Sequence, residues 1–132
     1  MPKAKILVVD DEPFICRLIQ SRLKANDYEV VIGSSGLEAL DKAKKEKPDL
    51  IMLDIIMPQM DGLEALSGLK SNDETKSIPV IMLSAKGTQD SIIKATTELG
   101  AAAYIIKPFD PGILLDTVKK ALEKKTNEQK AA

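Results

Sequence analysis

The chain has 132 residues, a length typical of one compact domain with its own hydrophobic core. Its 19 basic and 20 acidic residues nearly cancel, so the charge balance gives no sign of a strongly basic domain that binds nucleic acid or anionic membranes. There is no histidine and only one cysteine, so histidine triads, histidine metal ligands and internal disulfides are excluded.

Five short apolar runs recur along the chain, separated by segments of helix length. They cover residues 6–9, 30–32, 50–53, 80–83 and 102–106. The runs do not alternate apolar and polar residues, so we expect buried strands with helices on both faces of the sheet. Strand and helix units in alternation predict an α/β fold with an open, doubly wound sheet of parallel strands, because the chain is too short for a closed barrel.

The sequence shows neither the pattern of a signal peptide nor that of a membrane-spanning segment. The first residues lead directly into the first apolar run without the apolar region of a signal peptide, and no run is long enough to span a membrane. We therefore expect a cytoplasmic protein that binds neither membrane nor nucleic acid. We assign residues 1–125 to the domain and interpret residues 126–132 as a polar, frayed tail.

Polar side chains follow the ends of the apolar runs. The carboxyl ends of parallel strands meet at one edge of the sheet, where folds of this class bind their ligands. Asp10, Asp11 and Glu12 follow the first run, Asp54 the third, Ser84 the fourth and Lys107 the fifth. Singly, Asp11 could cap a helix, Asp54 could begin a turn and Lys107 could be a solvated amine. Their joint placement favours one shared site.

This set of residues fits phosphoryl transfer. The carboxylates of Asp10, Asp11 and Asp54 would repel one another unless a cation lay among them, and an all-oxygen set suits Mg²⁺, with Mn²⁺ as an alternative. Mg²⁺, the Lys107 ammonium and the Ser84 hydroxyl could each contact one phosphoryl oxygen. Asp54 is then the predicted nucleophile, which forms an acyl phosphate.

In this order, the residues resemble the receiver domain of two-component response regulators over residues 5–124. The matching elements are Asp10–Asp11, Asp54 within residues 53–58, Asp61–Gly62, Ser84–Ala85 and Lys107–Pro108–Phe109. The resemblance implies a flavodoxin-like (βα)5 fold with strand order 2-1-3-4-5, and a cis peptide between Lys107 and Pro108. It implies Asp54 as the phosphorylation site, Asp11 as a direct metal ligand, Asp10 as a ligand through water, and the Ile56 carbonyl as a further ligand.

The resemblance also implies partners and a switch. The chain has no histidine, so a phosphohistidine donor must lie on another protein, which the resemblance implies is a sensor kinase or a phosphotransfer protein. Phosphorylation would draw Ser84 toward the phosphoryl group, and Tyr104 would turn inward into the vacated space. This would change the face formed by the fourth helix, fifth strand and fifth helix, which would dock a downstream protein or support relay of the phosphoryl group. As the alternative, Tyr104 is an ordinary half-buried aromatic.

Two positions bear on the lifetime of the phosphoryl group. Ile56 is bulky and apolar where fast-resetting members often carry a polar residue, so it should exclude attacking water and slow hydrolysis. Lys86, two residues beyond Ser84, lies at the rim of the expected site and complicates this forecast.

Several alternatives stay open. An aspartate-nucleophile phosphatase of the haloacid dehalogenase type would need a second carboxylate where this chain has Ile56. A nucleotide- or flavin-binding module would need glycines where this chain has Asp10, Asp11 and Glu12. A pseudo-receiver that is never phosphorylated usually lacks part of this set of residues. We expect a stand-alone regulator of the chemotaxis or sporulation-relay type, monomeric or dimeric on phosphorylation; a receiver cut from a longer regulator is the alternative.

Overall fold

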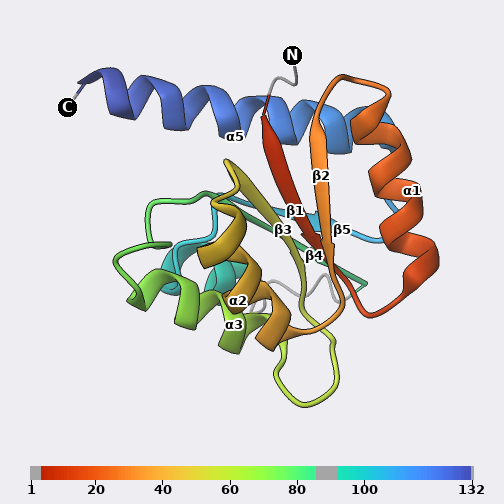
Figure 1. Ribbon diagram of the computed structural model, residues 1–132, viewed down its shortest axis with the longest axis horizontal. Coiled ribbons are helices and arrows are strands. Elements are labelled where there is room, and N and C mark those ends of the chain that lie inside the picture. The colour runs from red at the N-terminus through yellow and green to blue at the C-terminus, as the bar shows by residue number, and fades with distance from the viewer. Residues whose placement is uncertain (1–3, 86–91, 132) are drawn as a thin grey trace.

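The computed structural model of the chain describes residues 4–85 and 92–131, and it contains one parallel sheet (Figure 1). Its strands are β1 (Lys5–Val9), β2 (Glu29–Gly33), β3 (Leu50–Asp54), β4 (Val80–Ser84) and β5 (Ala103–Ile106). They lie in the order β2-β1-β3-β4-β5, and every neighbouring pair is parallel. The predicted α/β fold, its five apolar strands and their order are confirmed.

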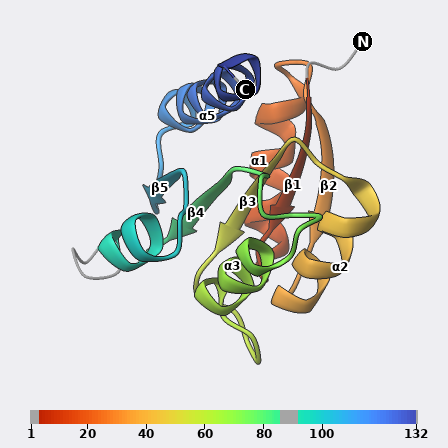
Figure 2. The same ribbon diagram turned by 90° about the vertical axis from the view of Figure 1, so that its left-hand side faces the viewer.

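Helices cover both faces of this sheet. They are α1 (Pro13–Lys24), α2 (Gly36–Glu46), α3 (Gly62–Ser71), the π-helical segment η1 (Lys94–Glu98) and α5 (Pro111–Ala131). Figures 1 and 2 show α1 and α5 on one side of the sheet and α2 and α3 on the other. η1 belongs to the fourth helical segment of the chain, whose described part begins at Ile92.

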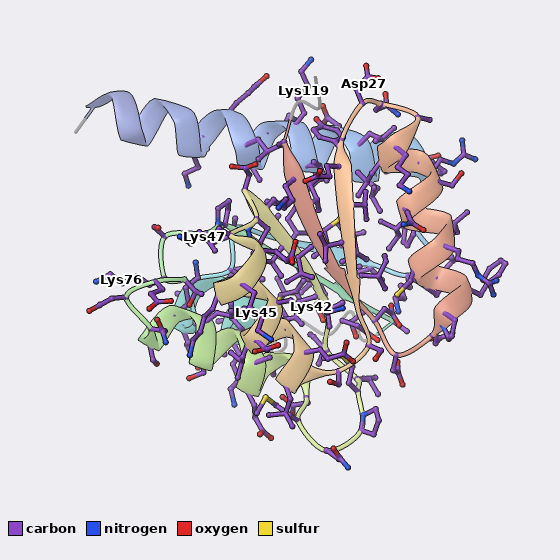
Figure 3. All side chains as sticks on the ribbon, viewed as in Figure 1. Asp27, Lys42, Lys45, Lys47, Lys76 and Lys119 are labelled. Carbon is purple, nitrogen blue, oxygen red and sulfur yellow. The ribbon has the colours of Figure 1, made fainter. Side chains whose placement is uncertain are left out.

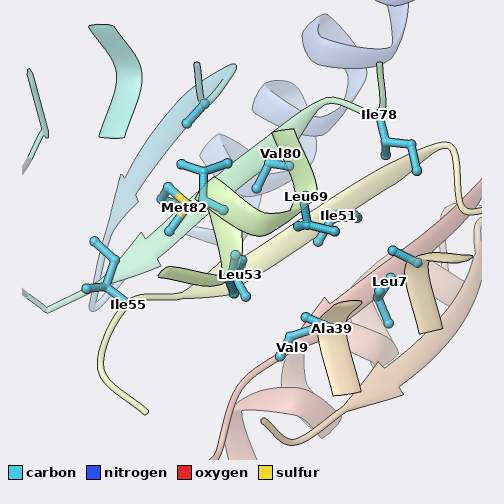
Figure 4. Packing of buried hydrophobic residues seen from close by; sticks show 14 of the residues in the cluster. Leu7, Val9, Ala39, Ile51, Leu53, Ile55, Leu69, Ile78, Val80 and Met82 are labelled. Atoms are coloured by element: carbon cyan, nitrogen blue, oxygen red, sulfur yellow. The ribbon is translucent and has the colours of Figure 1, made fainter. Parts of the chain in front are cut away.

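Successive residues of each strand pack into two separate hydrophobic clusters. Leu7, Ile51 and Val80 face α2, α3 and η1, whereas their neighbours Ile6, Leu50 and Ile81 face α1 and α5. Figure 4 shows the first cluster, in which side chains of the central strands meet those of α2 and α3. Each fully buried Leu or Ile contributes about 1.5–3 kcal/mol. The runs lack alternation because both of their faces are buried.

The end of the chain differs from our expectation. We expected residues 126–132 to form a frayed tail, but α5 continues as a helix through Ala131. Glu, Gln, Lys and Ala are strong helix formers, and extending a helix that already packs on the sheet needs no new nucleus. No helix end therefore marks a domain boundary at residue 125, and that boundary stays a prediction. Among the described residues, no helix is both long and apolar enough to cross a membrane.

Candidate functional site

The side chain of Lys107 joins two buried carboxylates at the carboxyl edge of the sheet. Its Nζ donates a hydrogen bond to Asp10 Oδ2 at 2.8 Å and lies 3.5 Å from Asp54 Oδ2. Asp10 is 1% exposed and Asp54 is 3% exposed. Since Lys107 follows β5, it reaches past the end of β4 to the ends of β3 and β1. The structure thus brings together three of the residues that the sequence singled out.

The loop after β1 gathers further negative charge. Asp10, Asp11 and Glu12 each offer a carboxylate oxygen, and these oxygens lie within 4.8 Å of one another. The Glu12 amide donates a hydrogen bond to Asp10 Oδ1 at 2.9 Å, so both Asp10 oxygens are engaged. Glu12 occupies the N-cap position of α1, and its side chain makes no capping hydrogen bond. The alternative of Asp11 as a helix cap is therefore wrong.

The predicted carboxylate ligands and the carboxylates that lie closest together are not the same set. Asp10 and Asp11 belong to the group of mutually close carboxylates in the described part of the chain, but Asp54 does not. Glu12 completes the group, although sequence reasoning left it out of the ligand set. The sequence feature that could have identified Glu12 is its position directly after Asp10 and Asp11.

The charges at this edge do not balance. Among the residues that the structure describes, the four carboxylates of Asp10, Asp11, Glu12 and Asp54 gather near one ammonium, that of Lys107, which leaves three negative charges. Burial and the charge of Asp10 raise the pKa of Asp54 to about 6, against the opposing effect of Lys107. Burial lowers the pKa of Lys107, but its hydrogen bond to Asp10 and the charge of Asp54 outweigh burial and raise it. Hard oxygen donors with uncompensated charge fit a divalent cation such as Mg²⁺.

A glycine holds the loop after Asp54 close to the sheet. The Gly62 amide donates a hydrogen bond to the Ile55 carbonyl at 2.7 Å. A Cβ atom at Gly62 would lie 2.1 Å from the Asp54 carbonyl oxygen, so no other residue fits there without a shift of the backbone. Asp61 caps α3 by accepting a hydrogen bond from the Glu64 amide at 2.8 Å. This explains the pair Asp61–Gly62, which sequence analysis singled out by resemblance alone.

Ser84 and Tyr104, the residues of the expected switch, are in contact. Ser84 is fully buried at the end of β4. The Tyr104 ring packs against the hydrophobic cluster under α2 and α3, and its hydroxyl shares a hydrogen bond with the Ser84 side chain. Burial raises the pKa of Tyr104 in spite of this bond, and the nearby charge of Asp54 acts in the same direction.

The remaining predicted positions have different outcomes. The peptide between Lys107 and Pro108 is cis, as the resemblance implied. The Ile56 side chain is 61% exposed at the loop after β3. Lys86 lies outside the described residues. The assignments of site residues to metal binding, phosphoryl contact and lifetime stay predictions.

Comparison with known proteins decides the family. The chain matches the family model for the response regulator receiver domain over residues 6–119. It belongs to this family. The receiver domain is a signalling module of two-component response regulators, so family membership favours this function over the phosphatase and the nucleotide-binding alternatives. It also agrees with the acidic residues at the carboxyl edge, where a nucleotide-binding module would have glycines.

Individual relatives extend over most of this receiver domain. This chain is 42% identical over 127 residues to sporulation initiation phosphotransferase F of Bacillus subtilis. The match covers 96% of this chain and 100% of that protein. The crystal structure of a response regulator from Chloroflexus aurantiacus is similar with a TM-score of 0.86 and 34% identity, covering 93% of this chain and 99% of that one.

Another relative is longer than this chain. The alkaline phosphatase synthesis transcriptional regulatory protein PhoP of Bacillus subtilis is 43% identical over 121 residues, which are 91% of this chain. The same residues span only 49% of PhoP. Receiver domains similar to this one therefore occur both as nearly the whole of a protein and as half of a larger one.

Proposed function

We propose that Asp54 accepts a phosphoryl group from a phosphohistidine of a sensor histidine kinase or a phosphotransfer protein. The observation that carries this proposal is the buried Asp54 carboxylate, 3.5 Å from the Lys107 ammonium and beside the acidic loop after β1. An Asp54 oxygen attacks phosphorus and forms the new O–P bond. The N–P bond breaks, and its electron pair stays on the leaving imidazole. At neutral pH Asp54 is mostly ionised, so it needs no separate base.

Asp10, Asp11 and Asp54, with the Ile56 carbonyl, would hold Mg²⁺, and Mn²⁺ is an alternative. When bound, this cation supplies positive charge to the oxygens of the transferred phosphoryl group. Both Asp10 oxygens already accept hydrogen bonds, from the Glu12 amide and from Lys107, which favours contact through water for Asp10. Asp11 is exposed and free to ligate directly, and Glu12 is a further candidate ligand.

Lys107 and Ser84 contact the phosphoryl oxygens in this proposal. The raised pKa of Lys107 keeps its ammonium charged throughout the neutral range. A charged donor close to the acceptor carboxylate stabilises the negative charge that spreads over the phosphoryl oxygens during transfer. The Ser84 hydroxyl, fully buried at the end of β4, serves as the uncharged donor.

The output surface lies on the fourth helical segment, β5 and α5. Ser84 connects the site to Tyr104 on β5 through their hydrogen bond, so movement of Ser84 toward a phosphoryl group would release the Tyr104 hydroxyl. Three large apolar side chains on these elements are exposed: Ile93, Ile106 and Ile113. Exposed apolar side chains on these elements suit the docking of a downstream protein. We place these interactions in the cytoplasm. We propose that the regulator is a monomer, with dimerisation on phosphorylation as the alternative.

Ile56 sets a long phosphoryl lifetime in this proposal. Its exposed apolar side chain follows Asp54 by two residues and would cover the approach of water to the acyl phosphate. Lys86, the other position expected at the rim, lies outside the described residues.

The test is intact-mass spectrometry after incubation with acetyl phosphate, with and without Mg²⁺, on the wild type and on Asp54→Asn. A Mg²⁺-dependent gain of one phosphoryl group that is absent in Asp54→Asn supports the proposal. A folded wild type that gains no mass overturns it. Steady release of phosphate without a trapped adduct would instead indicate a phosphatase.

A further inference from the structure

A pocket lies at the amino edge of the sheet, at the opposite end of the strands from Asp54. Its volume is about 360 Å³, and its lining comes from the end of α3, the loop before β4, η1, the loop before β5, and α5. The polar lining residues are Lys70, Lys76, Ser77, Thr96 and Lys124. None of the site residues discussed above contributes to this pocket.

Among the side chains that the structure describes, three lysines line the pocket and no carboxylate does. Lys124 has no ion-pair partner among the side chains that the structure describes. Lys76 pairs with Asp73 at 2.9 Å, but the Asp73 side chain is 93% exposed, so solvent weakens this pair. The pocket therefore holds positive charge that the protein itself barely compensates.

Lys70 is held at the wall of the pocket. Its Nζ donates hydrogen bonds to the carbonyls of Lys76 at 3.2 Å and Ile78 at 3.0 Å. An ammonium group has three donors, so one N–H of Lys70 remains for a ligand. Burial lowers the pKa of this amine, which means that an anion in the pocket would favour its charged form. Lys70 is thus a fixed donor, whereas Lys76 and Lys124 reach in from the rim.

A neighbouring pocket at the same edge of the sheet shows that uncompensated positive charge is not a general property of this edge. That pocket, of about 600 Å³, is lined by Lys44 and Lys47 but also by Asp49 and Glu74. Two carboxylates cancel its two ammonium groups. Figure 3 shows Lys47 and Lys76 on the same side of the molecule, so the two pockets offer a matched comparison within one protein.

We propose that the pocket at Lys70, Lys76 and Lys124 binds a small organic phosphate. Three ammonium groups suit a multiply charged phosphate better than a carboxylate, and the volume leaves room for an organic group beside it. The other walls are mostly small or apolar residues such as Pro79 and Ala101, which suit that organic group. The Thr96 hydroxyl already donates to the Ile92 carbonyl, so its oxygen is available to accept a hydrogen bond from the ligand. This inference stands on the lining residues alone and does not depend on phosphorylation of Asp54.

The test is titration of the full chain with ribose 5-phosphate, followed by calorimetry and by amide spectra, with EDTA present and ionic strength held constant. EDTA keeps metal out of the acidic site, so a response must arise elsewhere. We expect one saturable event that shifts the amide signals of Gly100 and Ala101, and an affinity about tenfold weaker in Lys124→Gln and in Lys76→Gln. Lys47→Gln, in the neighbouring pocket, should bind as the wild type does.

Two outcomes would overturn the proposal. One is the absence of saturable binding to the folded wild type. The other is an equal loss of affinity in Lys47→Gln, which would reveal general attraction to a lysine-rich surface. Inorganic phosphate, which has no organic group, is the control for that group's contribution. It must bind more weakly than ribose 5-phosphate. Equal affinity for the two would refute the part of the proposal that assigns the small and apolar walls to an organic group.

Discussion

The acidic site at the carboxyl edge of the sheet and the lysine pocket at the amino edge carry opposite charge, and they hold it in different ways. At the carboxyl edge, Asp10 and Asp54 are buried and Lys107 lies between them. At the amino edge, Lys76 and Lys124 are exposed, and the Lys76 pair with Asp73 lies in solvent. Burial makes electrostatic interactions stronger and less sensitive to salt. Changes at the carboxyl edge should therefore affect stability and chemistry strongly, whereas changes at the amino edge should affect only binding.

The largest effect is expected from Gly62→Ala. The new Cβ atom would meet the Asp54 carbonyl oxygen, so the loop must move and the Asp54 carboxylate with it. We expect a loss of about 3 kcal/mol or more in the free energy of unfolding, together with slower phosphorylation. Urea unfolding and the intact-mass assay measure the two effects.

Gly68→Ala is the matched control, because Gly68 lies within α3 and its Cβ would meet the flexible end of the Leu40 side chain. This change should be nearly neutral, or should stabilise by up to about 1 kcal/mol. If the two alanine variants behaved alike, the close approach at Gly62 would not be what holds the site.

Asp54→Asn should stabilise the protein in the absence of metal. The folded pKa of Asp54, about 6, is raised above its ordinary value of 3.8, so folding favours the protonated form. Ionised Asp54 therefore destabilises the folded protein. This penalty is absent below the unfolded pKa of Asp54, grows as pH rises from the unfolded to the folded pKa, and is complete above the folded pKa. At about pH 8 we expect a gain of about 2–3 kcal/mol in Asp54→Asn. The gain should vanish near pH 4 in urea unfolding with EDTA.

Asp73→Asn provides the comparison at the amino edge. Its carboxylate is exposed, and the change should alter stability by less than about 0.5 kcal/mol at any pH. A pH-dependent gain as large as that of Asp54→Asn would mean that burial does not distinguish the two edges.

On the proposal that Mg²⁺ binds the folded acidic site, it should stabilise the wild type by about 1–3 kcal/mol. Asp11→Asn should lose most of this effect in thermal unfolding. The sharper question concerns Glu12, which lies with Asp10 and Asp11 but was not among the predicted ligands. If Glu12→Gln loses the Mg²⁺ effect as fully as Asp11→Asn, Glu12 is a ligand. An unchanged effect would favour the predicted set.

The smallest effect is expected from Ile56→Asn. A polar side chain at this exposed position should admit water to the acyl phosphate and shorten its lifetime several-fold, equivalent to about 1 kcal/mol in the barrier. Decay of the phosphorylated mass over time measures the rate. Ile56→Val, which keeps the position apolar, should decay at nearly the wild-type rate. An unchanged or slower decay in Ile56→Asn would contradict the role of Ile56.

The sequence by itself determined the strands and the chemical character of the site. A buried strand of a parallel sheet is apolar on both faces, so runs such as residues 50–53 are visible without any partner. The residue after each run must then lie at the carboxyl edge, which placed Asp10, Asp54 and Lys107 together before any distance was known. These inferences depend on the local pattern of apolar residues and on the rule that strand–helix–strand units form parallel strands. Both apply to a continuous stretch of sequence.

Only the tertiary structure decided how side chains from different segments meet. Gly62 is required because α3 returns so close to the Asp54 backbone, and no local pattern contains that distance. The pocket at Lys70, Lys76 and Lys124 likewise draws on several separate segments. Such positions depend on packing and on the close approach of distant parts of the chain, which a sequence pattern does not encode residue by residue.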